Sequence, residues 1–182
     1  MTDPTLGGAR PWRLGARPRK GVLVVHIVSA GVWLGIDVVM AVFIFSALLA
    51  DDDNTKALCY RALELFAVWP LLTAGLVCLA SGVVLGLGTK YGLVRYWWVA
   101  IKLVLNILLS ALVLIALRPE VSKAAEQGWR FAAGEPASLV VGNLIFPPIV
   151  SPTALLIAVV LAVFKPWGRI RRKRPAPQQD AR

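Results

Sequence analysis

Long apolar segments alternate with short polar ones along this 182-residue chain, and four of the apolar segments are about as long as a membrane is thick. A helix needs about 20 mainly apolar residues to cross a hydrocarbon core of about 30 Å. Each of the four segments reaches or approaches that length, so the pattern predicts four transmembrane helices. The predicted spans cover about residues 22–49, 65–87, 97–117 and 146–164.

The fourth predicted span is the least regular. Three prolines, the last of them Pro152, stand just before the apolar run that ends at Phe164. Ser151 followed by Pro152 is typical of a helix N-cap and a first helical position. A helix from Pro152 to Phe164 would be only about 20 Å long, so residues 139–150 must supply the rest of the crossing. We therefore expect a broken or re-entrant start to this span.

The remaining segments are polar and predict the parts of the chain outside the hydrocarbon. Residues 1–20 and 166–182 are basic, hold little that can be buried, and are expected to be disordered. Residues 57–69 indicate an interfacial lead-in to the second span. Residues 118–145 indicate an outside loop with a short amphipathic helix near residues 120–133. The fold class is therefore an all-α membrane bundle, formed by one domain over residues 21–165.

Composition agrees with this prediction, because 58% of the residues are hydrophobic and only 16% are charged. The net charge of +10 raises the question of nucleic-acid binding. However, 14 of the 20 lysines and arginines lie in the two tails and in the link between the second and third spans. The positive-inside rule then places both termini in the cytoplasm and the protein in the inner (plasma) membrane. We expect the tails to contact the anionic lipid leaflet, with no nucleic-acid partner.

Ionisable side chains within the predicted spans are candidates for function, because they are costly to bury in lipid. His26 and Asp37 lie eleven residues apart on the first helix, with Trp33 between them, so all three share one face. Lys102 and Asn106 lie one turn apart on the third helix. His26 and Lys102 fall at a similar depth near the cytoplasmic side, so they could face one shallow polar pocket.

Asp37 admits two interpretations. It is either a protonated carboxyl group bonded to Ser110 or Thr73, or part of a relay for protons or cations. A direct ion pair with Lys102 is not expected, because the two residues differ in depth by about 15 Å. Lys102 alternatively extends to the cytoplasmic headgroups and has no other role.

The sequence offers little for a metal site. His26 is the only histidine, and it fits a hydrogen-bonded packing residue as well as a single haem ligand. No metal centre is therefore predicted, the cofactor stays open, and haem at His26 remains an alternative.

Glycines on the second span predict close helix packing. Gly75, Gly82 and Gly86 fall on roughly one face, and the last two form a GxxxG pair. Small residues at this spacing let a neighbouring backbone approach closely, within the chain or in a homo-oligomer or membrane partner.

Several segments resemble a family of small, uncharacterised bacterial integral membrane proteins over roughly residues 20–165. They are VHIVSAGVWLG in the first span, SGVVLGLGTKYGLVRYWWVAIKLVLN around the second link, and ALRPEV after the third span. This resemblance implies a four-helix membrane fold and no known activity. His26 with Trp33, and Trp98 with Lys102 and Leu103, also resemble patterns in the haem-pathway protoporphyrinogen oxidase family. This weaker resemblance to the oxidase family implies a haem-linked role. The histidine in the first span also resembles that of copper-resistance permease domains.

Together these observations favour a polytopic membrane protein that is a non-enzymatic module or an accessory subunit. Two alternatives stay open. One is a haem- or quinone-linked redox protein that uses His26 and Lys102. The other is a small proton-coupled permease that uses Asp37.

Overall fold

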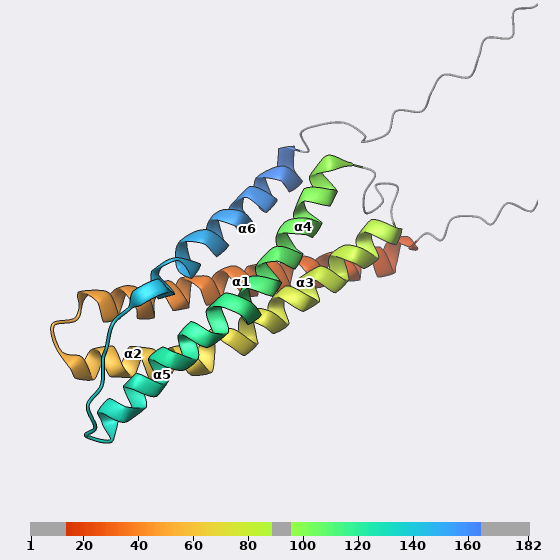
Figure 1. The fold of residues 1–182 in the computed structure, drawn as a ribbon. Coiled ribbons are helices and arrows are strands. Elements are labelled where there is room, and N and C mark those ends of the chain that lie inside the picture. The colour runs from red at the N-terminus through yellow and green to blue at the C-terminus, as the bar shows by residue number, and fades with distance from the viewer. Residues whose placement is uncertain (1–13, 89–95, 165–182) are drawn as a thin grey trace, which may run out of the picture.

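The computed structural model describes residues 14–88 and 96–164, and the regular elements in these ranges are all helices (Figure 1). The expected C-terminal tail and residues 1–13 of the expected N-terminal tail lie outside the described residues. The first helix begins at Ala16, five residues before the expected end of the N-terminal tail. The elements are α1 (Ala16–Leu49), α2 (Asp53–Phe66), α3 (Val68–Gly88), α4 (Trp97–Leu112), a π-helical segment (Val113–Leu117), α5 (Arg118–Ala132), a 3-10 turn (Gly142–Ile145) and α6 (Pro147–Phe164).

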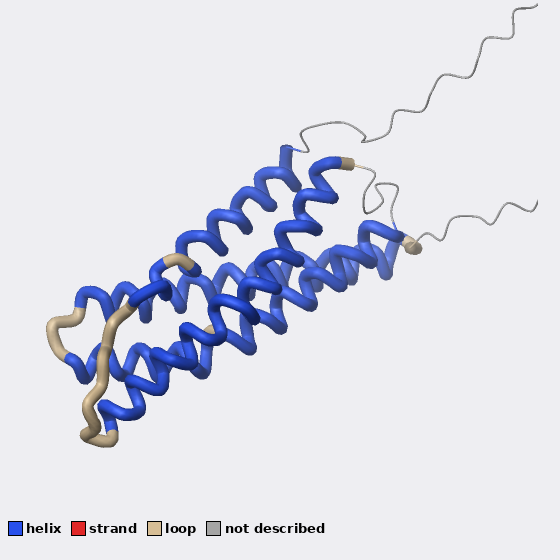
Figure 2. The backbone as a smooth tube through the Cα atoms, in the orientation of Figure 1, coloured by secondary structure: helices blue, strands red, loops and turns tan. Residues whose placement is uncertain are grey.

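Four helical rods are long and apolar enough to cross a membrane, which confirms the predicted fold class. They are residues Ala16–Leu49, Asp53–Gly88, Trp97–Ala132 and Gly142–Phe164. The rods run side by side as an elongated bundle (Figure 2). The beginnings of α1 and α4 and the ends of α3 and α6 share one end of the bundle (Figure 1).

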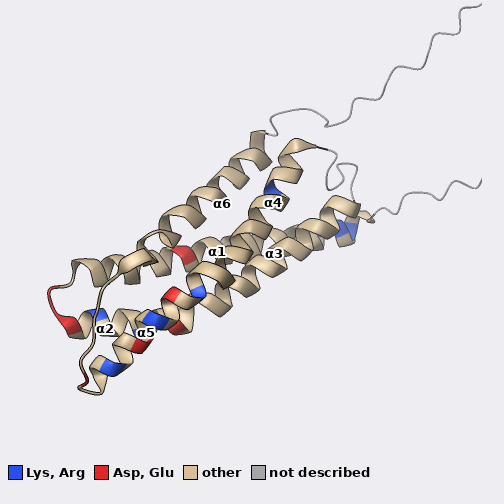
Figure 3. Cartoon of the chain, viewed as in Figure 1, with Lys and Arg blue, Asp and Glu red and all other residues tan. Residues whose placement is uncertain are grey.

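The second and third rods are each 36 residues long, about 54 Å, and therefore exceed the roughly 30 Å hydrocarbon core. Their extra length is α2 and α5, which lie together at the end of the bundle opposite the start of α1 (Figure 1). Charged side chains are concentrated on these two helices (Figure 3). Since charges are costly in lipid, the hydrocarbon segment of these rods corresponds to α3 and to α4 with the π-helical segment.

The α2–α5 pair is held together by polar and aromatic contacts. The guanidinium of Arg61 lies 3.8 Å from the centroid of the Trp129 ring, and Trp129 Nε1 donates a hydrogen bond to Glu64 at 3.0 Å. A Cβ atom on Gly128 would lie 2.8 Å from the Ala57 carbonyl oxygen, so the two helices approach closely there. The predicted amphipathic helix is thus present, but it continues directly from the third span.

Two prolines explain the irregularities in the long rods. Pro70 has no N–H to donate to the Phe66 carbonyl, and the helix is interrupted beside it at Ala67, between α2 and α3. Pro119 likewise has no N–H to donate to the Ile115 carbonyl. The chain here is π-helical, and the Arg118 N–H donates to the Val113 carbonyl. Neither proline ends its rod, because helix continues on both sides.

The start of α6 differs from the prediction. Helix begins at Pro147, so Ser151 and Pro152 lie inside it and the N-cap assignment for Ser151 is wrong. The expected break is a 3-10 turn from Gly142 to Ile145, which passes directly into α6 rather than forming a re-entrant loop. With 18 residues, α6 is about 27 Å long, close to the thickness of the hydrocarbon core.

The core lies along one stripe of α1 that packs chiefly against α3 and α2. Ser29, Trp33 and Asp37 form its first half and are buried. Met40, Ile44 and Ala47 form the second half, and their exposed fractions are no more than 1%. The same stripe therefore changes from polar to apolar along the helix.

Gly75 on α3 makes the close contact of α1 and α3 achievable. A Cβ atom there would lie 2.7 Å from Cζ3 of the Trp33 ring, a distance that real Cβ contacts do not show. In contrast, a Cβ atom on Gly35 would meet nothing within 4 Å. The glycine face predicted from the sequence thus has a defined packing partner within the chain.

We expect Gly75→Ala to destabilise the protein by about 1–3 kcal/mol, because the added methyl group forces the Trp33 ring to move. Gly35→Ala is the matched control and should be neutral or stabilising by up to about 1 kcal/mol. Thermal unfolding of the two detergent-purified variants measures the difference. Equal stability of the two variants would contradict the packing described here.

Candidate functional site

Two polar clusters lie inside the bundle on the same stripe of α1. We call the cluster nearer the turn between α1 and α2 the outer cluster and the one nearer the start of α1 the inner cluster. The outer cluster is centred on Asp37, which is fully buried, and includes Trp33. The inner cluster is centred on His26, which is half-buried and nearer the start of α1. The His26, Trp33 and Asp37 side chains all lie on the packed side of the helix, as their spacing predicts.

In the outer cluster, Ser151 of α6 connects two side chains of α1. Its hydroxyl donates a hydrogen bond to Asp37 Oδ2 at 2.7 Å and accepts one from Trp33 Nε1 at 3.1 Å. Asp37 Oδ1 is also buried but has no hydrogen-bond partner. The carboxyl group is therefore satisfied on one oxygen only.

The partners expected for Asp37 are instead bonded elsewhere. Thr73 donates to the Trp69 carbonyl of its own helix at 2.8 Å. Ser110 donates to Asn106 Oδ1 at 3.4 Å. Ser151 was not predicted as the partner of Asp37, because the Ser-Pro pattern indicated a helix cap, where the hydroxyl would bond a nearby backbone group.

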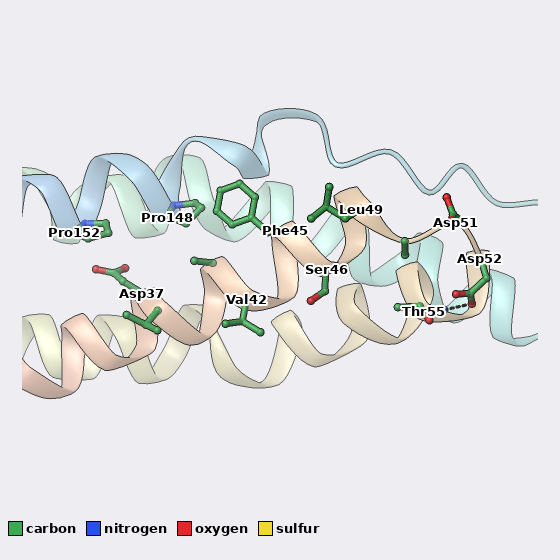
Figure 4. A pocket seen from close by; sticks show the side chains of 13 residues that line it. Asp37, Val42, Phe45, Ser46, Leu49, Asp51, Asp52, Thr55, Pro148 and Pro152 are labelled. Carbon is green, nitrogen blue, oxygen red and sulfur yellow. Dashed lines mark hydrogen bonds between the residues drawn. The ribbon is translucent and has the colours of Figure 1, made fainter.

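An open groove of about 770 Å³ leads from Asp37 to the turn between α1 and α2. Its walls are one face of α1 and the two prolines of α6, and the Asp37 carboxyl group points toward those prolines (Figure 4). The far end carries Asp51 and Asp52 (Figure 4). The lining residues are Asp37, Val38, Ala41, Val42, Phe45, Ser46, Leu49, Ala50, Asp51, Asp52, Thr55, Pro148 and Pro152.

Asp52 caps α2 and stays ionised. Its carboxylate accepts a hydrogen bond from the Thr55 backbone N–H at 2.8 Å, and this bond lowers the pKa of Asp52 below its usual value. Asp52 therefore keeps its negative charge at neutral pH, at the outer end of the groove.

In the inner cluster, His26 is fixed against α3. Its Nδ1 lies 3.0 Å from the Cys78 carbonyl and 3.1 Å from Ser81 Oγ. A carbonyl only accepts, so the neutral ring that makes this bond carries its proton on Nδ1 and a lone pair on Nε2. A Cβ atom on Gly82 would lie 3.2 Å from Cε1 of His26, so Gly82 makes room for the imidazole. Gly86 is also buried on α3.

Lys102 and Asn106 bring α4 to the inner cluster. The Lys102 ammonium lies 4.8 Å from the centroid of the Trp98 ring and acts electrostatically on both His26 and Cys78. The Asn106 side chain lies near the Cys78 thiol. The structure therefore brings His26, Lys102 and Asn106 together and places Asp37 in the other cluster.

Trp33, Gly75 and Ser110 connect the two clusters. A Cβ atom on Gly75 would meet both the Trp33 ring and Ser110 Oγ, at 2.7 and 3.1 Å, so these side chains lie beside each other. Ser110 bonds Asn106, and Trp33 bonds Ser151. These side chains form a series that we call the polar track. In order, they are Asp37, Ser151, Trp33, Ser110, Asn106, Cys78 and His26.

The haem- or quinone-linked role of His26 stays a prediction. Among the described residues there is no group of three His, Cys, Asp or Glu side chains that could hold a metal ion. The ring orientation leaves one histidine nitrogen for a ligand, and the nearest sulfur, Cys78 Sγ, lies 3.7 Å from the other nitrogen, Nδ1. The polar contacts of His26 are thus accounted for by its helix neighbours.

We expect Ser151→Ala to destabilise the protein by about 1–3 kcal/mol, because it leaves Asp37 Oδ2 and Trp33 Nε1 buried without partners. Thr153→Ala is the matched control on the same helix, since that hydroxyl is exposed and bonds the Ile149 carbonyl. The control should change stability by less than about 0.5 kcal/mol. Thermal unfolding in detergent compares them, and similar values would show that Ser151 does not join the two helices.

Comparison with protein families gives a match to the family described as predicted integral membrane protein (DUF2269), over residues 21–166. The match covers the second, third and fourth helical rods in full, all but the first five residues of the first rod, and both polar clusters. Comparisons with curated proteins and with solved structures found no match. The extent of the family match confirms the resemblance seen in the sequence, and the chain belongs to the DUF2269 family of predicted integral membrane proteins.

Proposed function

We propose that this protein is a small proton-linked membrane permease in which Asp37 binds and releases the proton. The observation that carries the proposal is the fully buried Asp37 carboxyl group, which has one unpaired oxygen and lies at the inner end of a groove. This function is one of the two alternatives that the sequence left open beside the favoured non-enzymatic module or accessory subunit.

Energetics support a cation-binding role for Asp37. A charged carboxylate in a membrane-spanning helix is costly unless it is paired or fully hydrogen-bonded. Ser151 supplies one donor, and Oδ1 has none. A bound proton or another cation removes the uncompensated charge, so the site favours taking one up from the groove.

The polar track supports movement across the bundle rather than binding alone. It extends from the groove to His26, whose neutral ring has a lone pair on Nε2 that can accept a proton. Lys102 of α4 carries a positive charge near this end of the track and repels other cations there. Trp33 and Ser110 occupy the middle of the track, where polar contacts are fewest.

Asp37→Asn should abolish proton flux, because the amide keeps an acceptor for Ser151 but cannot bind and release a proton. The measurement uses purified protein in liposomes with an internal pH dye and a potassium diffusion potential. We expect a drop of at least about tenfold in the protein-dependent rate. Glu126→Gln, a charge-neutralising change at an exposed position on α5, is the control and should keep the wild-type rate.

The proposal fails if a folded Asp37→Asn protein, checked by circular dichroism and gel filtration, carries protons as fast as the wild type. It also fails if wild-type protein gives no flux above that of empty liposomes.

We also propose that both termini lie in the cytoplasm and that α2 and α5 lie on the outer side. Fourteen of the 20 lysines and arginines sit on the side assigned to the cytoplasm, which supports this orientation. A cysteine placed by Glu126→Cys should then react with a membrane-impermeant maleimide in intact cells, because the α5 surface faces outward. A cysteine placed by Gln178→Cys should react only after the membrane is opened. The reverse pattern would invert the topology.

A further inference from the structure

We propose that the groove between α1 and α6 is the substrate site and that its substrate class is an apolar organic cation, which exchanges with the proton on Asp37. This inference rests on the proposed permease function and adds the ligand class. It is carried by acidic groups at both ends of a groove whose walls are otherwise apolar.

Charge complementarity excludes an anion as the natural occupant. Asp37 closes the inner end of the groove, and Asp51 and Asp52 stand at the outer end (Figure 4). Among the described residues that line the groove, none is a lysine, arginine or histidine that could balance these acids. A cation therefore gains attraction at each end, and Asp37 presents a carboxyl group with one unpaired oxygen at the inner end.

The walls select an apolar body for this cation. Val42 and Leu49 are 58% and 79% exposed in the groove face of α1, and the Phe45 side chain is 39% exposed. An aromatic ring in such a position can both cover an apolar group and attract a cation through its face. A small hydrated metal ion would leave these surfaces unused, whereas an organic cation would cover them.

The dimensions fit a ligand of this kind. A volume of about 770 Å³ falls within the roughly 300–1,000 Å³ range of small-molecule sites. From Asp37 to Leu49 the wall of α1 runs about 18 Å, counted at the usual helical rise. Pro152 adds to the inner end, because it has no N–H for the Pro148 carbonyl and leaves that oxygen without its usual helical donor.

The exchange is balanced in charge and protons. The neutral Asp37 carboxylic acid releases its proton to water in the groove, and the resulting carboxylate holds the organic cation. The titratable groups that share the groove are Asp51 and Asp52, while α6 presents Ser151 and two prolines to Asp37. On α3 the buried residues include no titratable group except Cys78, which belongs to the inner cluster. Competition between proton and cation at Asp37 is therefore the main expected source of pH dependence.

Tetraphenylphosphonium and tetraphenylborate test this proposal, because they share shape and apolar surface but carry opposite charges. Equilibrium dialysis with the full chain in a neutral detergent should show saturable binding of the cation, at least about tenfold tighter than that of the anion. Lowering the pH should weaken cation binding. In unbuffered solution, binding should release protons.

Asp37→Asn should weaken cation binding at least about tenfold and abolish proton release. Phe45→Ala, at a partly exposed wall position, should weaken binding several-fold while the protein stays folded. It provides an independent test if the Asp37 variant does not fold. Glu126→Gln is the control and should bind as the wild type does.

Equal binding of the two ions, or cation binding unchanged by both Asp37→Asn and Phe45→Ala, overturns the proposed ligand class. The liposome experiment keeps the two proposals separate. Asp37-dependent proton flux without selective cation binding overturns the ligand class alone. Selective, Asp37-dependent cation binding without proton flux overturns the permease function alone.

Discussion

The side chain of Trp33 sets the distance and register between the spanning helices, and both polar clusters depend on its position. Its ring lies against Gly75 of α3, beside Ser110 of α4, and its indole N–H is bonded to Ser151 of α6. One residue of α1 therefore meets all three other spans. Because the ring is large and rigid, it fixes the approach of α3 and α6 at one level of the bundle, and Asp37 one turn away receives its hydrogen bond from the same serine.

This arrangement explains why a buried carboxyl group is tolerated in the bundle. Lipid offers no hydrogen bonds, so a polar side chain must find partners within the protein. Asp37 obtains one donor from Ser151, which also accepts from Trp33, and its second oxygen is buried without a partner. The free-energy cost of burying a carboxyl group with too few hydrogen bonds is offset by the surrounding packing of α1 on α3 and α2. Such a site can exist only where helix packing holds it in place.

The sequence was sufficient for the spans, because lipid imposes a length and an apolarity that are visible in the residues. It also placed His26, Trp33 and Asp37 on one face, since helical periodicity is local. The partner of Asp37 was not predictable: Ser151 is 114 residues away, and the prolines around it resembled a helix start. The continuity of the long rods was missed because residues 57–69 were interpreted as an interfacial lead-in and residues 118–145 as an outside loop. The structure has helix on both sides of Pro70 and Pro119.

The π-helical segment from Val113 to Leu117 has a consequence for how α4 and α5 are related. One extra residue in a turn advances every later side chain by about 100° around the axis. The residues of the rod that pack inside the bundle are therefore out of helical phase with the residues that pack on α2. Leu109 and Val113 belong to the first phase, and Val121 and Gly128 to the second. A single extra residue thus lets one uninterrupted rod pack in two environments, where a regular helix would present a mismatched face to one of them.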